Sequence, residues 1–203
     1  MKTNPYSGKF IVFDGLDGSG LSTQVNLLKD FLLKKGYQVI STKEPTKDSE
    51  AGKKIRELLD KKTKTSAFKL QKLFTQDRKE HLEKVIIPAL KGEKIVISDR
   101  YSFSTLSFGV ASGVNLEKLI EMQNDFLLPD LTFFLKVSPD ICLSRIRKRG
   151  NTRTLFEEKK KLKEVWKVYE ALPDRFDNVY IVNGEKSIPE VFQQIQRIIN
   201  QEL

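Results

Sequence analysis

A glycine-rich turn that directly follows a short apolar run constrains this sequence more than any other feature. The run Lys9–Phe13 is apolar after its first residue and ends at the turn Asp14–Gly20. A continuous apolar run of this length, bounded by turn residues, is typical of a buried parallel strand. The turn leads into Ser22-Thr23-Gln24, which opens a helical pattern. This order of strand, turn and helix points to a parallel α/β arrangement.

The spacing of the turn matches the phosphate-binding pattern G-x-x-x-x-G-K-[ST], with Leu21 at the lysine position. Glycines let backbone N–H groups turn inward around phosphate oxygens, and the following helix directs its positive end to the same place. A plain strand-to-helix turn is the alternative, but the position after a buried strand favours a phosphate site. The candidate nucleotide-binding residues are Gly15, Leu16, Asp17, Gly18, Ser19, Gly20, Leu21, Ser22 and Thr23. The Ser22 hydroxyl is also a candidate ligand for Mg²⁺.

Strand and helix patterns alternate along the rest of the chain. Further strands are expected over 37–41, 95–98, 131–137 and 179–182, and helices over 21–35, 51–62, 66–90, 116–127, 139–149, 157–172 and 188–200. The pattern predicts an α/β fold with a five-stranded parallel sheet flanked by helices on both faces. Ligands of such sheets bind at the carboxyl ends of the strands, so chemistry is expected there.

The length of the chain favours one domain. At 203 residues it matches the prior of about 150 residues per domain, and a short polar stretch near 150–152 is expected to be a loop within domain 1–203. No apolar run approaches the ~18 residues of a membrane span. The start of the sequence lacks the apolar core of a signal peptide, so a cytoplasmic protein without membrane contact is expected.

Single copies of two residue types exclude several kinds of site. One cysteine, Cys142, excludes an internal disulfide, and with one histidine, His81, a Cys/His zinc site within one chain is excluded. A Ser-His-Asp triad would need His81, which lies in a charged run without a nucleophile motif. We expect His81 on a helix surface and Cys142 as a small buried apolar group.

The net charge of +9 favours anionic partners: nucleotides, nucleic acid or a membrane surface. The densest basic cluster runs from Arg145 to Arg149 and continues at Arg153. It lacks the interleaved aromatic residues of single-strand binding surfaces, which disfavours nucleic acid as a partner.

Several further segments resemble the thymidylate kinase family, and they occur in the order of that family. The similar segments are the loop Phe13–Gln24, Lys43-Glu44-Pro45, Leu73–Arg78, Asp99-Arg100-Tyr101 with Ser104 and Phe108, Pro129-Asp130-Leu131, and the basic stretch Arg145–Arg153. The resemblance extends from Phe10 to Ile198 and implies a P-loop NTPase fold, in a family that is usually homodimeric.

The resemblance implies transfer of the γ-phosphoryl group of ATP to thymidine monophosphate (dTMP), with Mg²⁺ as cofactor. On the acceptor side, Phe74 would stack on the base, Arg78 would read it, and Arg100 would hold the phosphate in the forked geometry that arginine offers. The implied substrate-binding residues are Glu44, Phe74, Arg78, Arg100, Tyr101, Ser104 and Phe108. Structural alternatives are core packing for Phe74, Tyr101 and Phe108, and an exposed ion pair with Glu80 or Glu83 for Arg78.

The catalytic residues follow from the same resemblance. Asp99 ends a predicted strand and is, with Ser22, the candidate metal ligand; a helix-capping aspartate is its alternative. Asp17 would contact the acceptor sugar or phosphate, although a turn-forming role is open. A basic lid over about 145–156 would close on the donor phosphates. The implied catalytic residues are Asp17, Arg100, Arg149 and Arg153.

The departure at Leu21 leaves three interpretations. A lid arginine or another lysine supplies the missing charge in an active kinase, the chain is a nucleotide-binding relative with little activity, or the substitution is engineered. Loss of such a contact costs on the order of 10²–10³ in rate. Because Phe74, Arg78 and Arg100 are all present, the sequence favours an active kinase.

Other departures affect single positions. Gly18 stands where one group of the family carries a basic residue, Thr46-Lys47 replaces a Gly-Gly pair, and Gly109 stands where many bacterial members carry glutamine. The acceptor therefore stays open between dTMP and another nucleoside monophosphate, such as deoxyuridylate.

Overall fold

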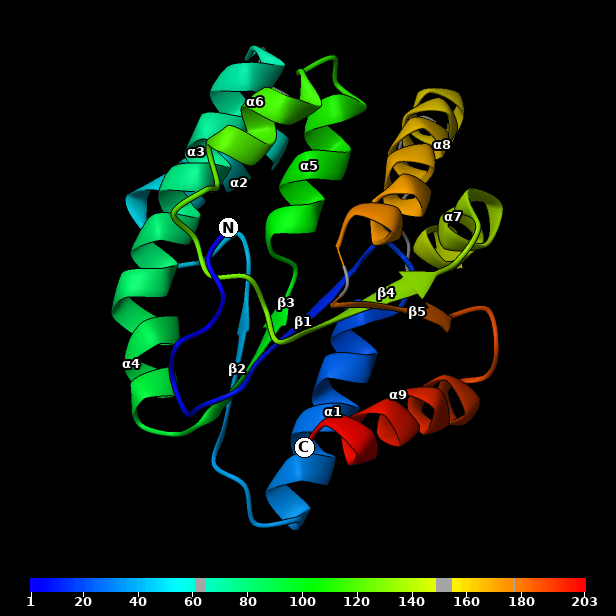
Figure 1. Ribbon diagram of the computed structural model, residues 1–203. Helices are drawn as coiled ribbons and strands as arrows, with labels where there is room; N and C mark the ends of the chain where they lie inside the picture. The colour runs from blue at the N-terminus through cyan, green and yellow to red at the C-terminus, as the bar shows by residue number, and fades with distance from the viewer. Residues whose placement is uncertain (61–64, 149–154, 177) are drawn as a thin grey trace.

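A five-stranded parallel sheet forms the centre of the molecule in the computed structural model, which describes residues 1–60, 65–148, 155–176 and 178–203. The strands are β1 (Phe10–Gly15), β2 (Val39–Lys43), β3 (Ile95–Asp99), β4 (Leu131–Lys136) and β5 (Val179–Asn183). Their order across the sheet is β2-β3-β1-β4-β5, and all pairs are parallel. The predicted fold class is confirmed (Figure 1).

Helices cover both faces of the sheet (Figure 1). They are α1 (Leu21–Lys34), α2 (Glu50–Asp60), α3 (Ala67–His81), α4 (Ile87–Lys91), α5 (Ser102–Val110), α6 (Leu116–Glu121), α7 (Pro139–Lys148), α8 (Leu155–Ala171) and α9 (Ile188–Glu202). A π-helical turn, η1 (Leu82–Ile86), joins α3 to α4, and a 3₁₀ turn, η2 (Pro173–Arg175), follows α8.

The central strand is buried on both sides, which explains its continuous apolar run. Ile11 and Phe13 pack with α1 and α9 on one face of the sheet. Phe10 and Val12 pack on the other face, with η1 and α4. The burial of successive residues leaves only the strand ends for polar chemistry, as expected of a central parallel strand.

Three helical segments differ from the prediction. Residues 102–110 form α5, which the sequence analysis did not predict because its serines, threonine and phenylalanines are poor helix formers. The helix expected over 116–127 ends at Glu121. The helix expected over 66–90 contains the π turn η1 just before Pro88, and this turn accommodates the missing N–H of the proline.

The prediction that His81 lies on a helix surface is wrong. Its side chain is 1% exposed, its Nδ1 lies 3.0 Å from Glu44 Oε1, and its Nε2 lies 2.6 Å from Thr42 Oγ1. Only part of the charged run is at the surface: Lys79 is exposed, whereas Asp77 and Arg78 are buried with His81. The face of α3 that carries His81 packs against the end of β2.

Cys142 is fully buried on α7, as predicted. Burial raises the pKa of its thiol to about 12, so the thiol stays protonated at neutral pH.

We expect a thiol reagent such as DTNB to react with the native protein only as fast as it unfolds at pH 7–8. Stopped-flow absorbance measures this rate, and immediate reaction of the native chain would contradict the burial.

No helix in the described part of the chain is long and apolar enough to cross a membrane.

Candidate active site

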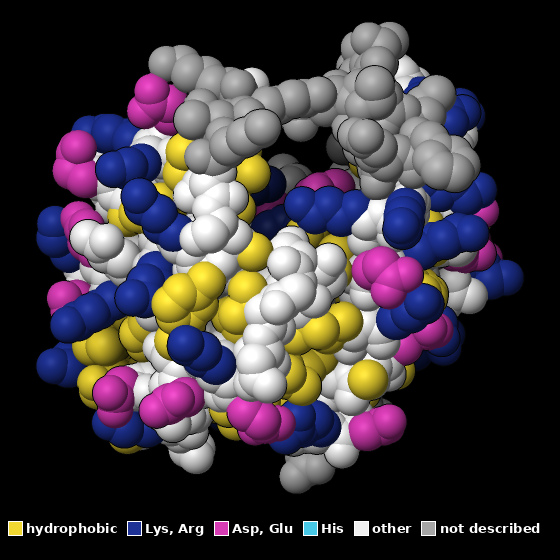
Figure 2. Space-filling view, turned by 90° about the horizontal axis from the view of Figure 1, so that it is seen from above, with side chains coloured by type: hydrophobic (Ala, Val, Ile, Leu, Met, Phe, Trp, Pro, Cys, Tyr) yellow, Lys and Arg dark blue, Asp and Glu magenta, His cyan; other side chains and the backbone are white. Residues whose placement is uncertain are grey.

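A polar pocket of about 140 Å³ lies at the carboxyl ends of β1, β2 and β3, beside the start of α1. Figure 2, which views the molecule from above relative to Figure 1, shows a hollow with basic and acidic side chains inside it. The residues lining the pocket are Leu16, Asp17, Gly18, Gly20, Leu21, Ser22, Thr23, Lys43, Asp99 and Arg100. The structure therefore brings most of the predicted phosphate loop together with both predicted metal ligands and Arg100.

The start of α1 is open to an anion. Gly20 precedes the helix in a left-handed conformation (φ 104°), no side chain caps the helix, and its first turn holds no acidic residue. The first backbone N–H groups of a helix lack partners within the helix, and the helix dipole favours negative charge there. These features suit the phosphate-binding role predicted for the loop.

The structure explains why position 18 carries glycine. Gly18 has a φ of +85°, and an added Cβ would lie 2.6 Å from the backbone oxygen of Cys142 on α7. A basic side chain, as in one group of relatives, has no room here.

Gly18→Ala is therefore expected to destabilise the protein by about 1 kcal/mol or more beyond Gly36→Ala. Gly36 is a matched control because its φ is +87° and nothing lies within 4 Å of an added Cβ. Both variants carry the strain of a left-handed alanine, and only Gly18→Ala adds the clash. Urea unfolding of the two variants makes the comparison, and equal losses would contradict the packing described here.

Ser22 and Asp99, the two predicted metal ligands, lie within hydrogen-bond distance of each other. The Ser22 hydroxyl donates to Asp99 Oδ2 at 2.5 Å, and Lys43 Nζ donates to the same oxygen at 2.8 Å. Asp99 Oδ1 is buried and has no hydrogen-bond partner among the described residues. A hydroxyl and an orphaned carboxylate oxygen form an oxygen donor set that fits Mg²⁺. Among the described residues, no group of three or more histidine, cysteine, aspartate or glutamate side chains is placed to hold a metal ion.

Arg100 is held at the edge of the pocket by three contacts. Its guanidinium donates to the Gly15 carbonyl, the Ser104 hydroxyl and the Asp17 carboxylate at 2.7–2.8 Å. Its φ of 78° places it in the left-handed region, a strained conformation that clusters at functional sites. Phe108 lies beside it, with the ring centroid 5.6 Å from Arg100 Cζ.

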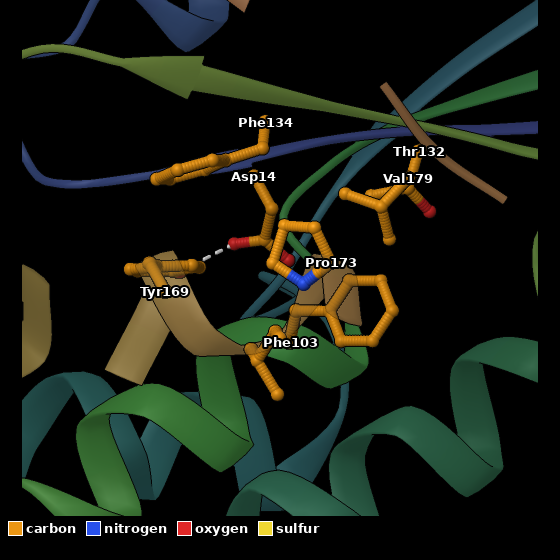
Figure 3. Close-up of a pocket in the computed structure, with 8 residues that line it drawn as sticks. Asp14, Phe103, Thr132, Phe134, Tyr169, Pro173 and Val179 are labelled. Carbon is orange, nitrogen blue, oxygen red and sulfur yellow. Dashed lines mark hydrogen bonds between the residues drawn. The ribbon is translucent and has the colours of Figure 1, made fainter. Parts of the chain in front are cut away.

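Asp14 binds Ser104, one of the residues that hold Arg100. Its carboxylate accepts hydrogen bonds from the Ser104 hydroxyl at 2.5 Å and from the Tyr169 hydroxyl at 2.7 Å. Burial raises the pKa of the Asp14 carboxyl, and the charge of Arg100 opposes that rise. Figure 3 shows Asp14 and Tyr169 among the residues that line a small cavity. The cavity has a volume of about 10 Å³, which is too small for a nucleotide.

Arg78 lies in a buried polar network. It is 1% exposed and donates to Glu44, Thr105 and Gln123 at 2.7–3.0 Å. The exposed ion pair with Glu80 or Glu83 is therefore wrong as an alternative. Phe74 lies one turn earlier on α3 and is half-buried. Base reading by Arg78 and base stacking by Phe74 stay predictions.

Tyr101 packs in the core, which was the structural alternative for this residue. Its ring meets Phe10 edge-on, with 5.0 Å between centroids, and its hydroxyl donates to the Leu127 carbonyl. The Arg78 guanidinium lies 4.8 Å from the centroid of the Tyr101 ring. Contact between Tyr101 and a substrate also stays a prediction.

The middle of the predicted lid, residues 149–154, lies outside the described residues, and Arg149 and Arg153 are among those not described. At the beginning of the segment, Arg145 donates to the backbone oxygens of Ser19 and Gly184 at 3.1–3.2 Å. Arg145 therefore fixes α7 against the phosphate loop.

Sequence reasoning missed four residues that support the site: Asp14, Thr105, Gln123 and Tyr169. Asp14 stands directly before the loop glycine, and a carboxylate at the end of a buried strand could have marked it. The other three carried no signal, because their roles depend on which elements pack together.

Comparison with known proteins decides the family. A family model described as "Thymidylate kinase" matches residues 13–195. A protein of Pyrococcus horikoshii named "Probable thymidylate kinase" is 39% identical over 202 residues, which cover 97% of this chain and 98% of the relative. Proteins named "Thymidylate kinase" from Caldicellulosiruptor saccharolyticus and Thermosipho africanus are 35% and 36% identical, with at least 95% of each chain covered. The chain belongs to the thymidylate kinase family.

Two departures from the thymidylate kinase pattern have local structural reasons. The segment after Pro45 is held by Asp77, whose carboxylate accepts from the Thr46 amide at 2.9 Å and from the Ser49 hydroxyl. At Gly109, an added Cβ would lie 2.6 Å from Leu119 Cδ1, so the Leu119 side chain would have to shift to admit a larger residue.

Proposed function

We propose that the chain transfers the γ-phosphoryl group of ATP to dTMP, giving ADP and thymidine diphosphate. The observation that carries the proposal is the pocket in which the glycine-rich loop, the Ser22–Asp99 pair and Arg100 meet. Family membership adds the reaction class, since the matching family and the named relatives are thymidylate kinases. The comparisons do not favour a nucleotide-binding relative without activity.

The donor half of the site is the loop and the start of α1. Backbone N–H groups of the loop bind the phosphates of ATP, and Ser22 and Asp99 hold Mg²⁺. When bound, Mg²⁺ neutralises charge on the donor oxygens. The orphaned Asp99 Oδ1 supports this role because a buried carboxylate oxygen without a partner is otherwise costly.

The acceptor half is centred on Arg100. Its guanidinium holds the phosphate of dTMP, and Asp17 and Ser104 orient that guanidinium. An oxygen of this phosphate forms the new bond to the γ-phosphorus, and the bond from that phosphorus to the β–γ bridging oxygen breaks. Transfer between two anions depends on positioning and charge neutralisation, for which arginine is well suited.

On this proposal, residues 1–203 form one kinase domain, and the segment over about 145–156 is its lid, with Arg149 and Arg153 at the transferring group. Family membership further suggests a cytoplasmic homodimer that binds small nucleotides and no nucleic acid. Sedimentation equilibrium measures the oligomeric state.

An acceptor panel tests the proposal. The protein is incubated with ATP, Mg²⁺ and one nucleoside monophosphate at a time, and the diphosphates are separated by ion-exchange chromatography. We expect product with dTMP and a lower rate with deoxyuridylate. Equal or faster turnover of another monophosphate would show that dTMP is not the preferred substrate. The kinase assignment would be overturned if none of the acceptors gave a product.

A further inference from the structure

We infer that Lys43, at the end of β2, supplies the charge on the donor phosphates that Leu21 does not supply from the loop. This inference rests on the proposed function, because it assigns a cation to the phosphate pocket of the same site. Lys43 would contact the terminal phosphates of ATP directly.

The Leu21 side chain brings no positive charge to the pocket. It is 6% exposed and packs in the main core with Val25 and Leu28. A leucine in this position offers no polar atom to a phosphate. The positive charge of the pocket must therefore come from another residue.

The described lining of the pocket holds two cationic side chains, Lys43 and Arg100. Arg100 is already bound to Gly15, Ser104 and Asp17, and it faces the acceptor half of the site. Arg145, the first residue of the basic cluster, donates to backbone oxygens of Ser19 and Gly184. Because Arg100 and Arg145 are held by these contacts, Lys43 is the described cation that can contact the donor phosphates.

The sheet itself fixes the place of Lys43. In the parallel register of β2 and β3, Lys43 stands directly opposite Asp99, and Asp99 in turn stands opposite Phe13 on β1. Lys43 Nζ lies 2.8 Å from Asp99 Oδ2 and 3.3 Å from the Ser22 hydroxyl. The ammonium therefore lies beside the first turn of α1, where donor phosphates would bind.

The Lys43 side chain can exchange partners. It is 58% exposed, whereas its partner Asp99 is 4% exposed. Lysine carries a point charge on a flexible stem, so its Nζ can turn from Asp99 to another anionic partner. An ion pair with Asp99 alone is the simpler role, and the test separates the two.

Binding of ATP analogues provides a readout apart from activity. We expect Lys43→Met to weaken binding of the β,γ-methylene analogue of ATP, with Mg²⁺, by about tenfold to a hundredfold, the loss given by one charge-assisted hydrogen bond. Binding of ADP should weaken less. Lys43→Arg should keep part of the affinity. Isothermal titration calorimetry measures all three.

Lys53→Met is the matched control. Lys53 pairs with Glu50 at 2.8 Å and is also 58% exposed, but it lies on α2. Its replacement should change nucleotide affinity less than twofold. If Lys43→Met behaves like this control, or weakens ATP analogue and ADP equally, the inference is overturned.

A compensating variant completes the test. In the Lys43→Met background, Leu21→Lys should restore much of the affinity for the ATP analogue if the two lysines serve the same phosphates. Thermal melting shows whether this double variant is folded, and the Lys43→Met and Lys43→Arg results stand without it. If the unmodified chain phosphorylates dTMP but Lys43→Met binds nucleotides as well as Lys53→Met does, the inference about Lys43 is rejected and the proposed function is kept.

Discussion

Replacing Arg100 with lysine is expected to lower kcat/KM for dTMP by about 10²- to 10³-fold. Lysine keeps the positive charge near Asp14 and Asp17 but loses the fork that reaches Gly15, Ser104 and the acceptor phosphate together. Binding of the ATP analogue should change little, because Arg100 serves the acceptor. Steady-state kinetics at varied dTMP measure the effect.

Arg175→Lys provides the control for this substitution. Arg175 pairs with Glu117 at 3.0 Å, and both side chains are exposed. We expect its kcat/KM to stay within about twofold of the unmodified protein, as for other exposed pairs. A similarly small effect of Arg100→Lys would show that Arg100 does not hold the acceptor phosphate.

The largest effect on stability is expected for Arg78→Met. In the unmodified protein, Arg78 Nη2 lies 2.7 Å from Glu44 Oε2, and the Glu44 side chain is 3% exposed. The variant leaves this buried carboxylate without its arginine partner. Breaking a buried ion pair by removing one partner costs about 3–5 kcal/mol. The free energy of unfolding in urea measures this loss.

Two further variants show where that cost arises. Lys84→Met removes the exposed pair with Glu80 and should cost less than about 1 kcal/mol. The double variant Arg78→Met/Glu44→Met removes both charges and should be more stable than Arg78→Met alone, since it also removes the buried Glu44 carboxylate that the single variant leaves beside the His81 ring without its guanidinium partner. A loss below about 1 kcal/mol for Arg78→Met would contradict the network described here.

The strands and the phosphate loop could be predicted because their signals are local. A buried parallel strand needs a continuous apolar run, and the loop needs glycines at fixed spacing, so the run before Gly15 marks both at once. α5 could not be predicted, because Ser102–Val110 becomes helical through burial against neighbouring elements and not through helix propensity.

The partners of the site residues depend on topology. Sequence analysis placed Arg78 on a helix near the acceptor, but Thr105 and Gln123 reach it from elements whose packing no local pattern encodes. His81 was misplaced for the same reason. Lys43 was visible only as part of a family-like segment, and the register of β2 with β3 places it at Asp99.

A single-turnover reaction shows whether this chain is a working kinase without a lysine in its phosphate loop. The protein is held in excess over γ-labelled ATP, in Mg²⁺, with and without dTMP. We expect the label to move from ATP to thymidine diphosphate only when dTMP is present. Label that stays in ATP, while calorimetry shows that both nucleotides bind, would contradict this expectation.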